Sequence, residues 1–132
     1  MKLNKNKFNS QSPLIMGVCN LTKDSFSDGG QNYRTSDALN NIKKMWEQGA
    51  SIIDIGAEST KPGSDPITYK KEIKKLEPIL KKIPKNKFII SIDSNKIETQ
   101  EFALKHGAHI INDIFGGNEE LFLLTKKYKS GL

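Results

Sequence analysis

Four short apolar runs separated by helix-like stretches constrain the fold of this 132-residue chain more than any other feature. Each run is rich in isoleucine or other strand-forming residues and is bordered by glycine, proline, asparagine or serine, which is typical of β-strands. The runs do not alternate strictly between apolar and polar residues, and this favours strands that are covered on both faces in a parallel sheet. They cover residues 14–20, 51–56, 88–93 and 109–114.

Two of the intervening stretches are expected to be helices that end at glycine. The first should run over 36–48, with Ser36 as its cap and Gly49 as its stop, and the third over 96–106, with Gly107 as its stop. The segments that follow, "GASIIDI" and "GAHIINDI", are similar to each other, and each leads from a helix stop directly into a strand. Such an internal repeat indicates βα units.

The other two helical stretches complete the pattern. One is expected to open at Asp65-Pro66, with the aspartate as cap, and to be kinked or split by Pro78. The last should begin near Asn118. The resulting order βαβαβαβα predicts a parallel α/β protein, either a short open sheet or half of an eight-unit barrel. Neither G-x-G-x-x-G nor G-x-x-x-x-G-K-[ST] occurs in the sequence, so a nucleotide cradle is not supported.

Composition argues against several classes of partner. The net charge is +6, but the lysines gather in 69–87, on the polar side of an apolar stripe, which is typical of a solvated outer helix rather than a nucleic-acid surface. No apolar run is long enough to span a membrane, and the polar leader 1–12 has no apolar stretch of a secretory signal. We therefore expect a cytoplasmic protein, in which the single Cys19 is a buried thiol.

Polar residues fall at or beyond the expected strand ends, where they could form a site for a ligand with several hydrogen-bonding groups. Asn20, Asp54, Asp93 and Asn112 come from four different strands. Each also has a structural alternative. Asp93 could cap the third helix, and Asn112 or Asp113 could hold the turn before Gly116-Gly117. Similarly, Glu58-Ser59-Thr60 and "SDGG" could be ordinary loop and turn, and His106 and His109 are expected to be structural.

Three stretches taken together resemble the N-terminal half of dihydropteroate synthase. They are "IMGVCNLTKDSFSDGG", "GASIIDIGAESTKPGS" and "SIDSNKIETQEFALKHGAHIINDIFGG", and the resemblance runs from about residue 14 to 117. It implies a (β/α)8 TIM barrel of which this chain holds the first four units, with 13–132 forming the N-terminal half of a pterin-binding domain. The family joins 4-aminobenzoate to 6-hydroxymethyl-7,8-dihydropterin diphosphate and releases pyrophosphate with the help of Mg2+.

The resemblance also implies roles for individual residues. Asp93 would accept the N–H donors of the pterin and serve as a catalytic residue, Asn112 would hold the ring, and Asn20 would support the magnesium ion. Two loops would close over the diphosphate and form the 4-aminobenzoate pocket. Phe26 would be an aromatic wall of that pocket, although a loop phenylalanine is more often a packing anchor. Thr60 and Lys61 would face the second substrate and the diphosphate, with Lys61 as a second catalytic residue.

Several features depart from the family pattern. Lys23 stands where the family usually has proline, Lys61 where it has arginine and Ser94 where it has threonine. The family's second half supplies an aspartate, the lysine of an S-R-K motif and an R-x-H motif, none of which is in these 132 residues, so we expect no synthase turnover from this chain alone. The intact enzyme is expected to be a homodimer that acts on small molecules. The alternatives are a non-catalytic pterin-binding half-barrel and, ranked lower, a methyltetrahydrofolate methyltransferase, which would lack the "DSFSDGG" loop.

The Lys61 departure gives a direct test. Arginine offers a bidentate fork to phosphate oxygens, whereas lysine offers a point charge. We therefore expect Lys61→Arg to tighten the binding of a dihydropterin diphosphate, measured by calorimetric titration. Unchanged affinity would count against a role of Lys61 at the diphosphate.

Overall fold

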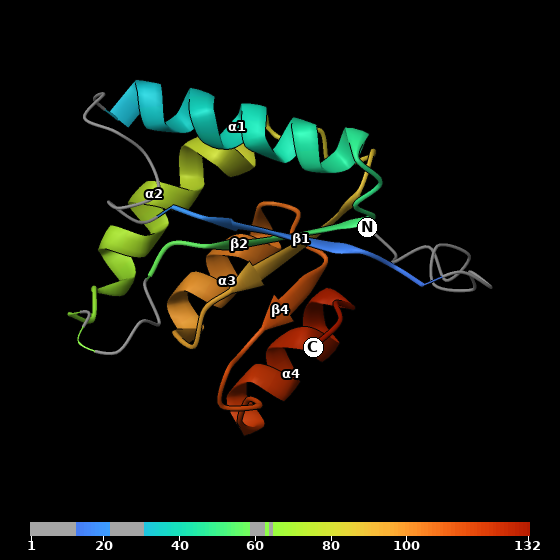
Figure 1. Ribbon diagram of the computed structural model, residues 1–132. Coiled ribbons are helices and arrows are strands. Elements are labelled where there is room, and N and C mark those ends of the chain that lie inside the picture. Colours follow the sequence, from blue (N-terminus) through green and yellow to red (C-terminus); the bar gives the residue numbers. More distant parts are fainter. Residues whose placement is uncertain (1–12, 22–30, 59–62, 64) are drawn as a thin grey trace.

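The computed structural model describes residues 13–21, 31–58, 63 and 65–132, with the side chains of 31–34 left aside (Figure 1). Strands and helices alternate along the chain, as the sequence predicts. They are β1 (Met16–Asn20), α1 (Gln31–Glu47), β2 (Ile52–Gly56), α2 (Tyr69–Lys82), β3 (Ile89–Asp93), α3 (Ile97–Lys105), β4 (Ile110–Asn112) and α4 (Glu119–Tyr128).

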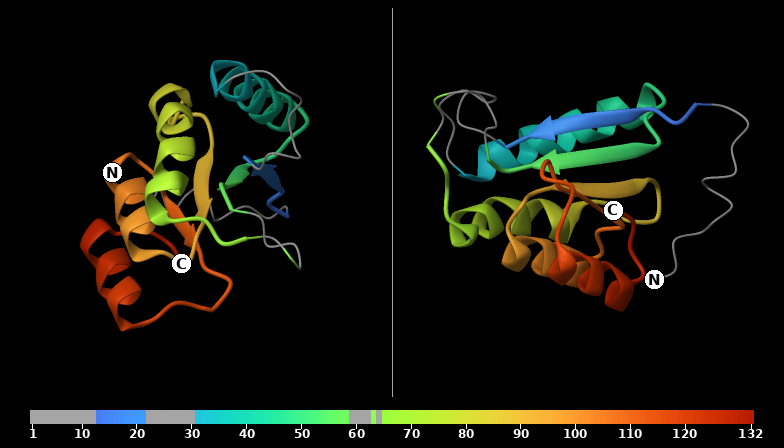
Figure 2. Two further views of the ribbon diagram at one scale, coloured as in Figure 1. Left: turned by 90° about the vertical axis from the view of Figure 1, so that its left-hand side faces the viewer. Right: turned by 90° about the horizontal axis from the view of Figure 1, so that it is seen from below.

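The four strands form one parallel sheet in the order β1-β2-β3-β4. A crossover between parallel strands is almost always right-handed, so strands in sequential order place their helices on the same face. In the left view of Figure 2 the four helices form an arc around one side of the sheet. A doubly wound sheet would reverse its strand order instead, and the observed order is that of consecutive units of a β/α barrel.

The two faces of the sheet differ in what they bury. The face toward the helices contributes isoleucines and the thiol of Cys19 to the core, in the set Cys19, Ile53, Ile55, Ile90, Ile92 and Ile111. Burial raises the pKa of Cys19 to about 11, so the thiol stays protonated and unreactive, as the sequence suggested. On the opposite face of β1, Val18 is 55% exposed. The sheet is thus covered by helices on one face and, along β1, open on the other.

The repeated Gly-Ala segments have a common structural basis. Gly49 and Gly107 have φ values of 103° and 90°, and each lies two residues after the last residue of a helix. The amide of the next alanine donates to the carbonyl five residues back, from Ala50 to Met45 and from Ala108 to Ala103. Both helices therefore end in a Schellman motif with glycine in the left-handed conformation, which confirms the two predicted stops.

Two of the four predicted helix starts are wrong, whereas α3 and α4 begin at Ile97 and Glu119, as predicted. Helix α1 begins at Gln31, so Ser36 lies inside the helix and is not its cap. Helix α2 begins at Tyr69 and is capped by Thr68, not by Asp65. The physical reason in the second case is a tertiary contact: the amide of Ile67 donates to Glu58 Oε1 at 2.8 Å, which holds this segment extended.

Two further boundaries correct the sequence prediction. Pro78 lies inside α2 without splitting it, because the buried Leu76, Ile79 and Leu80 on either side stabilise a continuous helix despite the roughly 3 kcal/mol cost of an internal proline. Strand β4 ends at Asn112 rather than at residue 114. Here the carbonyl of Asp113 accepts from the Gly116 amide and turns the chain away from the sheet.

Both histidines are structural, as expected. His106 Nδ1 lies 2.8 Å from the Phe102 carbonyl oxygen at the end of α3. His109 Nδ1 accepts a hydrogen bond from the Ile90 amide at 3.0 Å, at the entry of β4. Among the residues that the structure describes, no helix has the length and apolar character needed to cross a membrane.

Helix α4 ends in the same motif as α1 and α3, but with a lysine. Lys129 has a φ of 53°, and the Ser130 amide donates to the Thr125 carbonyl. An L-residue in this conformation costs about 1 kcal/mol more than glycine. We therefore expect Lys129→Gly to raise the free energy of unfolding by about that amount in urea titrations. Gly49→Ala should lower the free energy of unfolding by a similar amount. Nothing lies within 4 Å of the added Cβ, so the strained backbone conformation is the only cost. A destabilised Lys129→Gly would contradict this account of the helix ends.

Candidate functional site

Polar side chains from three strands lie in one row at the carboxyl edge of the sheet. The pairing register aligns Asn20 with Gly56, Gly56 with Asp93, and Asp93 with Asn112. Aligned residues of neighbouring parallel strands point to the same face. The row therefore lies on the face opposite the helix-packed isoleucines, which confirms that the strands deliver carboxylate and amide groups to one edge.

Gly56 leaves space at the centre of this row because it has no side chain. A Cβ at this position would lie 3.2 Å from Asn20 Oδ1 and 3.3 Å from Asp93 Oδ2. The two oxygens thus lean over the glycine from its two neighbouring strands, into space that any other residue would narrow. The absence of a side chain lets an amide oxygen and a carboxylate oxygen approach the same point.

Asp54 lies two residues before Gly56 on the same face and is 4% exposed. Its Oδ2 accepts a hydrogen bond from Asn112 Nδ2 at 3.0 Å, across β3. The other oxygen, Oδ1, and the Oγ of the neighbouring Ser91 are buried without a hydrogen-bond partner among the described residues. Buried polar atoms are rarely left unpaired, so this face of the sheet is suited to a polar group from elsewhere.

The environment of the row changes the ionisation of Asp93. Burial raises the pKa of Asp93, and the charges of nearby carboxylates raise it further, in the order Asp54, Glu72, Asp113 and Glu58. An ionised Asp93 is therefore held at an energetic cost. A ligand that offers N–H donors would relieve this cost, because it would stabilise the charged carboxylate.

The structure tests the cap and turn alternatives for Asp93, Asp113 and Asn112. The N-cap residue of α3 is Lys96, not Asp93, so Asp93 is not a helix cap. Asp113 does hold the turn, since its Oδ1 accepts from the Phe115 amide at 2.9 Å. Asn112 instead bonds to Asp54 and belongs to the row.

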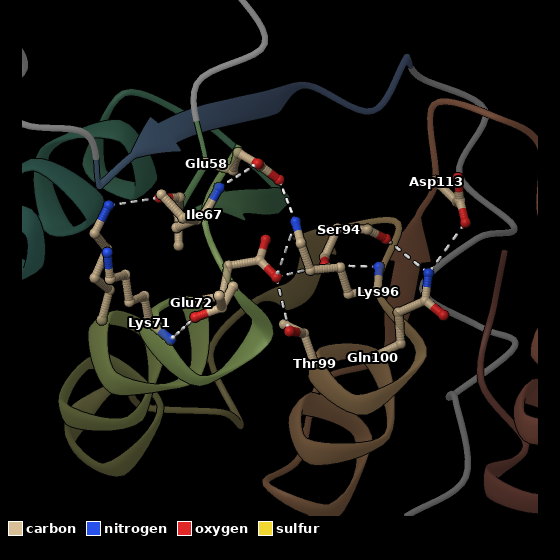
Figure 3. Close-up of polar contacts among 12 residues, drawn as sticks. Glu58, Ile67, Lys71, Glu72, Ser94, Lys96, Thr99, Gln100 and Asp113 are labelled. Carbon is tan, nitrogen blue, oxygen red and sulfur yellow. Dashed lines mark hydrogen bonds and ion pairs between the residues drawn. The ribbon is translucent and has the colours of Figure 1, made fainter. Parts of the chain in front are cut away.

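A cluster of charged side chains, with Glu72 buried and Glu58 and Lys96 partly buried, lies next to the row (Figure 3). Glu72 of α2 is fully buried, and its Oε2 accepts from Ser94 Oγ at 3.1 Å and from Thr99 Oγ1 at 2.7 Å. Lys96 Nζ pairs with this oxygen at 3.7 Å and also with Glu58 Oε2. The cluster joins α2, the start of α3 and the segment after β2.

Lys96 also sets the charge state of Glu58. Burial by itself would raise the pKa of Glu58, but the hydrogen bonds from Lys96 and from the Ile67 amide outweigh it. The positive charges of Lys96 and Lys75 act in the same direction, so the pKa of Glu58 lies below its usual value. Glu58 is therefore a structural anion at the edge of the site.

Sequence reasoning missed Glu72 and Lys96. Glu72 is buried on α2, whereas the neighbouring Ile73 is only partly buried. A signal was present, because Glu72 precedes Leu76 by four residues and thus lies on the same helix face. For Lys96 nothing in the pattern distinguishes it from the other lysines.

Of the remaining predicted residues, the structure describes Ser94. Phe26, Thr60 and Lys61, together with the departure at Lys23, lie outside the described residues. The hydroxyl of Ser94 lies in the cluster around Glu72. Among the described residues no group of three or more histidine, cysteine, aspartate or glutamate side chains could hold a metal ion.

Consecutive parallel βα units with a polar row at the carboxyl edge define a ligand-binding α/β protein of the barrel type. Comparison with known families narrows this class. Residues 16–132 match the model of the family described as pterin binding enzyme. The chain belongs to that family.

Individual relatives agree with this assignment. The dihydropteroate synthase of Streptococcus pyogenes serotype M1 is 43% identical over 117 residues, which are 86% of this chain and 44% of the relative. A solved dihydropteroate synthase of Clostridium difficile, determined in the presence of pteroic acid, superimposes with a TM-score of 0.85 and 37% identity, over 91% of this chain and 47% of that one. That of Xanthomonas albilineans with 4-aminobenzoic acid gives a TM-score of 0.78 and 31% identity, over 89% and 45%. The chain spans about half the length of these relatives.

The raised pKa of Asp93 predicts a pH-dependent penalty on folding. A carboxyl with a higher pKa in the folded state is most favourable to folding when protonated, and this contribution is lost as pH rises through the folded value. We therefore expect Asp93→Asn to be more stable than the unaltered protein at about pH 7, with a difference that shrinks towards about pH 4. Urea titrations across this range measure it, with the exposed Glu98→Gln as control. Lower stability of Asp93→Asn at neutral pH would contradict the raised pKa.

Proposed function

We propose that this chain forms the pterin-binding half of a dihydropteroate synthase, which joins 4-aminobenzoate to 6-hydroxymethyl-7,8-dihydropterin diphosphate and releases pyrophosphate. The observation that carries the proposal is the row across the sheet, in which Asp93 and Asn112 are direct neighbours in register on the face opposite the core. The similarity to dihydropteroate synthases over most of the chain supports it.

The residues of the row match the hydrogen-bonding groups of a pterin. A pterin edge presents several N–H donors side by side, and an ionised carboxylate accepts two of them in parallel. Asp93 would supply these acceptors, with the donors of the ring offsetting the repulsion from neighbouring carboxylates. Asn112 has its Nδ2 on Asp54, which leaves its Oδ1 to accept from the ring. The two side chains would thus orient the pterin at the edge of the sheet.

Magnesium fits the exposed amide of Asn20 as a ligand. Mg2+ prefers hard oxygen ligands and is commonly held by one or two protein oxygens together with substrate phosphates and water. Asn20 Oδ1 offers one such oxygen beside Gly56. When bound, the ion would stabilise the charge that develops on the departing diphosphate.

The reaction needs a positioned electrophile and a second substrate. The C–O bond to the diphosphate breaks, the arylamine nitrogen forms a bond to the pterin methylene carbon, and that nitrogen loses a proton. By resemblance, Thr60 and Lys61 would contact the second substrate and the diphosphate, and Phe26 would line the 4-aminobenzoate pocket. A cytoplasmic location and a homodimer of the intact enzyme complete the proposal.

Binding measurements with substitutions in the row test the proposal. We expect Asp93→Asn to weaken binding of 6-hydroxymethyl-7,8-dihydropterin diphosphate roughly 10- to 100-fold, since each hydrogen bond to a charged group contributes about 1.5–3 kcal/mol. Gly56→Ala should also weaken the binding, because its Cβ crowds Asn20 Oδ1 and Asp93 Oδ2. Calorimetric titration of the longest polypeptide that the gene encodes gives these affinities.

A control variant and product analysis complete the test. Glu98→Gln on the outer face of α3 should leave the affinity unchanged. Product analysis then separates the reactions: dihydropteroate and pyrophosphate support the proposal, whereas methyl transfer without pyrophosphate would overturn it. Tight pterin binding with no product from any form of the protein would favour a non-catalytic pterin-binding protein.

A further inference from the structure

The residue that follows Asp93 is bound through every polar group it has. The Ser94 amide donates to the Asn112 carbonyl at 3.1 Å, and the Ser94 carbonyl accepts from Gln100 Nε2 at 2.7 Å. Its hydroxyl donates to Glu72 Oε2 at 3.1 Å and accepts from the Lys96 amide at 3.2 Å. The chain next to Asp93 is therefore tied to β4, α2 and the start of α3.

Among the described residues, Glu72 is the only residue of α2 that forms a hydrogen bond with Ser94. It is fully buried on a helix whose other buried residues are the apolar Leu76, Ile79 and Leu80. A buried carboxylate is costly unless it is paired, so an apolar residue at this position would be the simpler solution for packing alone. What the carboxylate provides is an acceptor for two hydroxyl groups and a partner for Lys96.

The same carboxylate connects two parts of the rim. Through Lys96 it reaches Glu58, and Glu58 Oε1 holds the Ile67 amide at 2.8 Å. Glu58 and Ile67 border the segment 59–66. In Figure 3 the side chains of Glu58, Glu72, Lys96 and Ser94 converge from α2, the start of α3 and the segment after β2.

We propose that Glu72 is a positioning residue for Asp93, acting through the hydroxyl of Ser94. The inference rests on the proposed pterin-binding function. Glu72 and Asp93 both line a cavity of about 20 Å³, which is room for one water molecule, together with Ser94 and Glu58. Besides the direct effect of its charge on Asp93, Glu72 holds the position of Asp93 through its hydrogen bond to Ser94. Its removal should therefore loosen the pterin acceptor without removing any group that binds the pterin.

Three substitutions test this role in the longest polypeptide that the gene encodes. Glu72→Gln and Ser94→Ala should each raise the KM for 6-hydroxymethyl-7,8-dihydropterin diphosphate roughly tenfold and leave the KM for 4-aminobenzoate unchanged. Tenfold is the lower end of the effect of removing a group that holds a ligand-binding residue in place. Ser94→Thr keeps the hydroxyl and should retain the original KM. Glu77→Gln is the matched control, since Glu77 lies on the same helix in an exposed pair with Lys81.

Hydrogen exchange gives a readout that does not depend on turnover. The amides of Ser94 and Lys96 should exchange faster in Glu72→Gln and Ser94→Ala, and at the original rate in Ser94→Thr and Glu77→Gln. If Glu72→Gln does not fold, Ser94→Ala alone decides the matter.

The outcomes distinguish this proposal from the proposed function. Absence of pterin binding in the unaltered protein would contradict the proposed function, and the pterin role of Glu72 with it. Normal binding in the unaltered protein, with unchanged KM and unchanged exchange in both Glu72→Gln and Ser94→Ala, would overturn the positioning role alone. A selective rise in the pterin KM that Ser94→Thr does not show would support it.

Discussion

The in-register pairing of four parallel strands is the constraint on which the site depends. Side chains alternate between the faces of a strand, so a slip by one residue would turn Asp93 toward the helices and Ile92 toward the open face. Burial of Ile53, Ile90 and Ile92 against the helices opposes such a slip. The same apolar residues that drive folding therefore determine that Asn20, Asp93 and Asn112 share one edge.

The polar residues in and around this row carry energetic costs, from like charges and an unpaired buried oxygen, that apolar residues would not have. Asp93 lies among four other carboxylates, and Asp54 keeps one buried oxygen without a partner in the described part of the chain. Such groups persist only where the surrounding structure holds them in place. Helix α2 contributes to this by placing Glu72 under the end of β3, where it meets Ser94 and Lys96.

The sequence predicted those features that depend on residues close together in the chain. Apolar runs located all four strands, and glycines located the ends of α1 and α3, because a positive φ is a property of the residue itself. Helix starts were wrong where a distant contact intervened, as when Glu58 captures the Ile67 amide and α2 begins at Tyr69. The shared edge of Asp93, Asn112 and Asn20 was predictable because the ends of parallel strands converge. The spacing of Glu72 from Leu76 places it on the buried face of α2, but nothing in the sequence indicates its hydrogen bond to Ser94.

A crystal structure of the longest encoded polypeptide with 6-hydroxymethyl-7,8-dihydropterin diphosphate tests the central claim most directly. We expect the pterin ring at the carboxyl edge of the sheet, with its N–H donors on Asp93 and with Asn112 beside it. A ring bound elsewhere would contradict the account, for example in the cavity of about 320 Å³ at the opposite end of the strands, lined by Trp46 and Lys87.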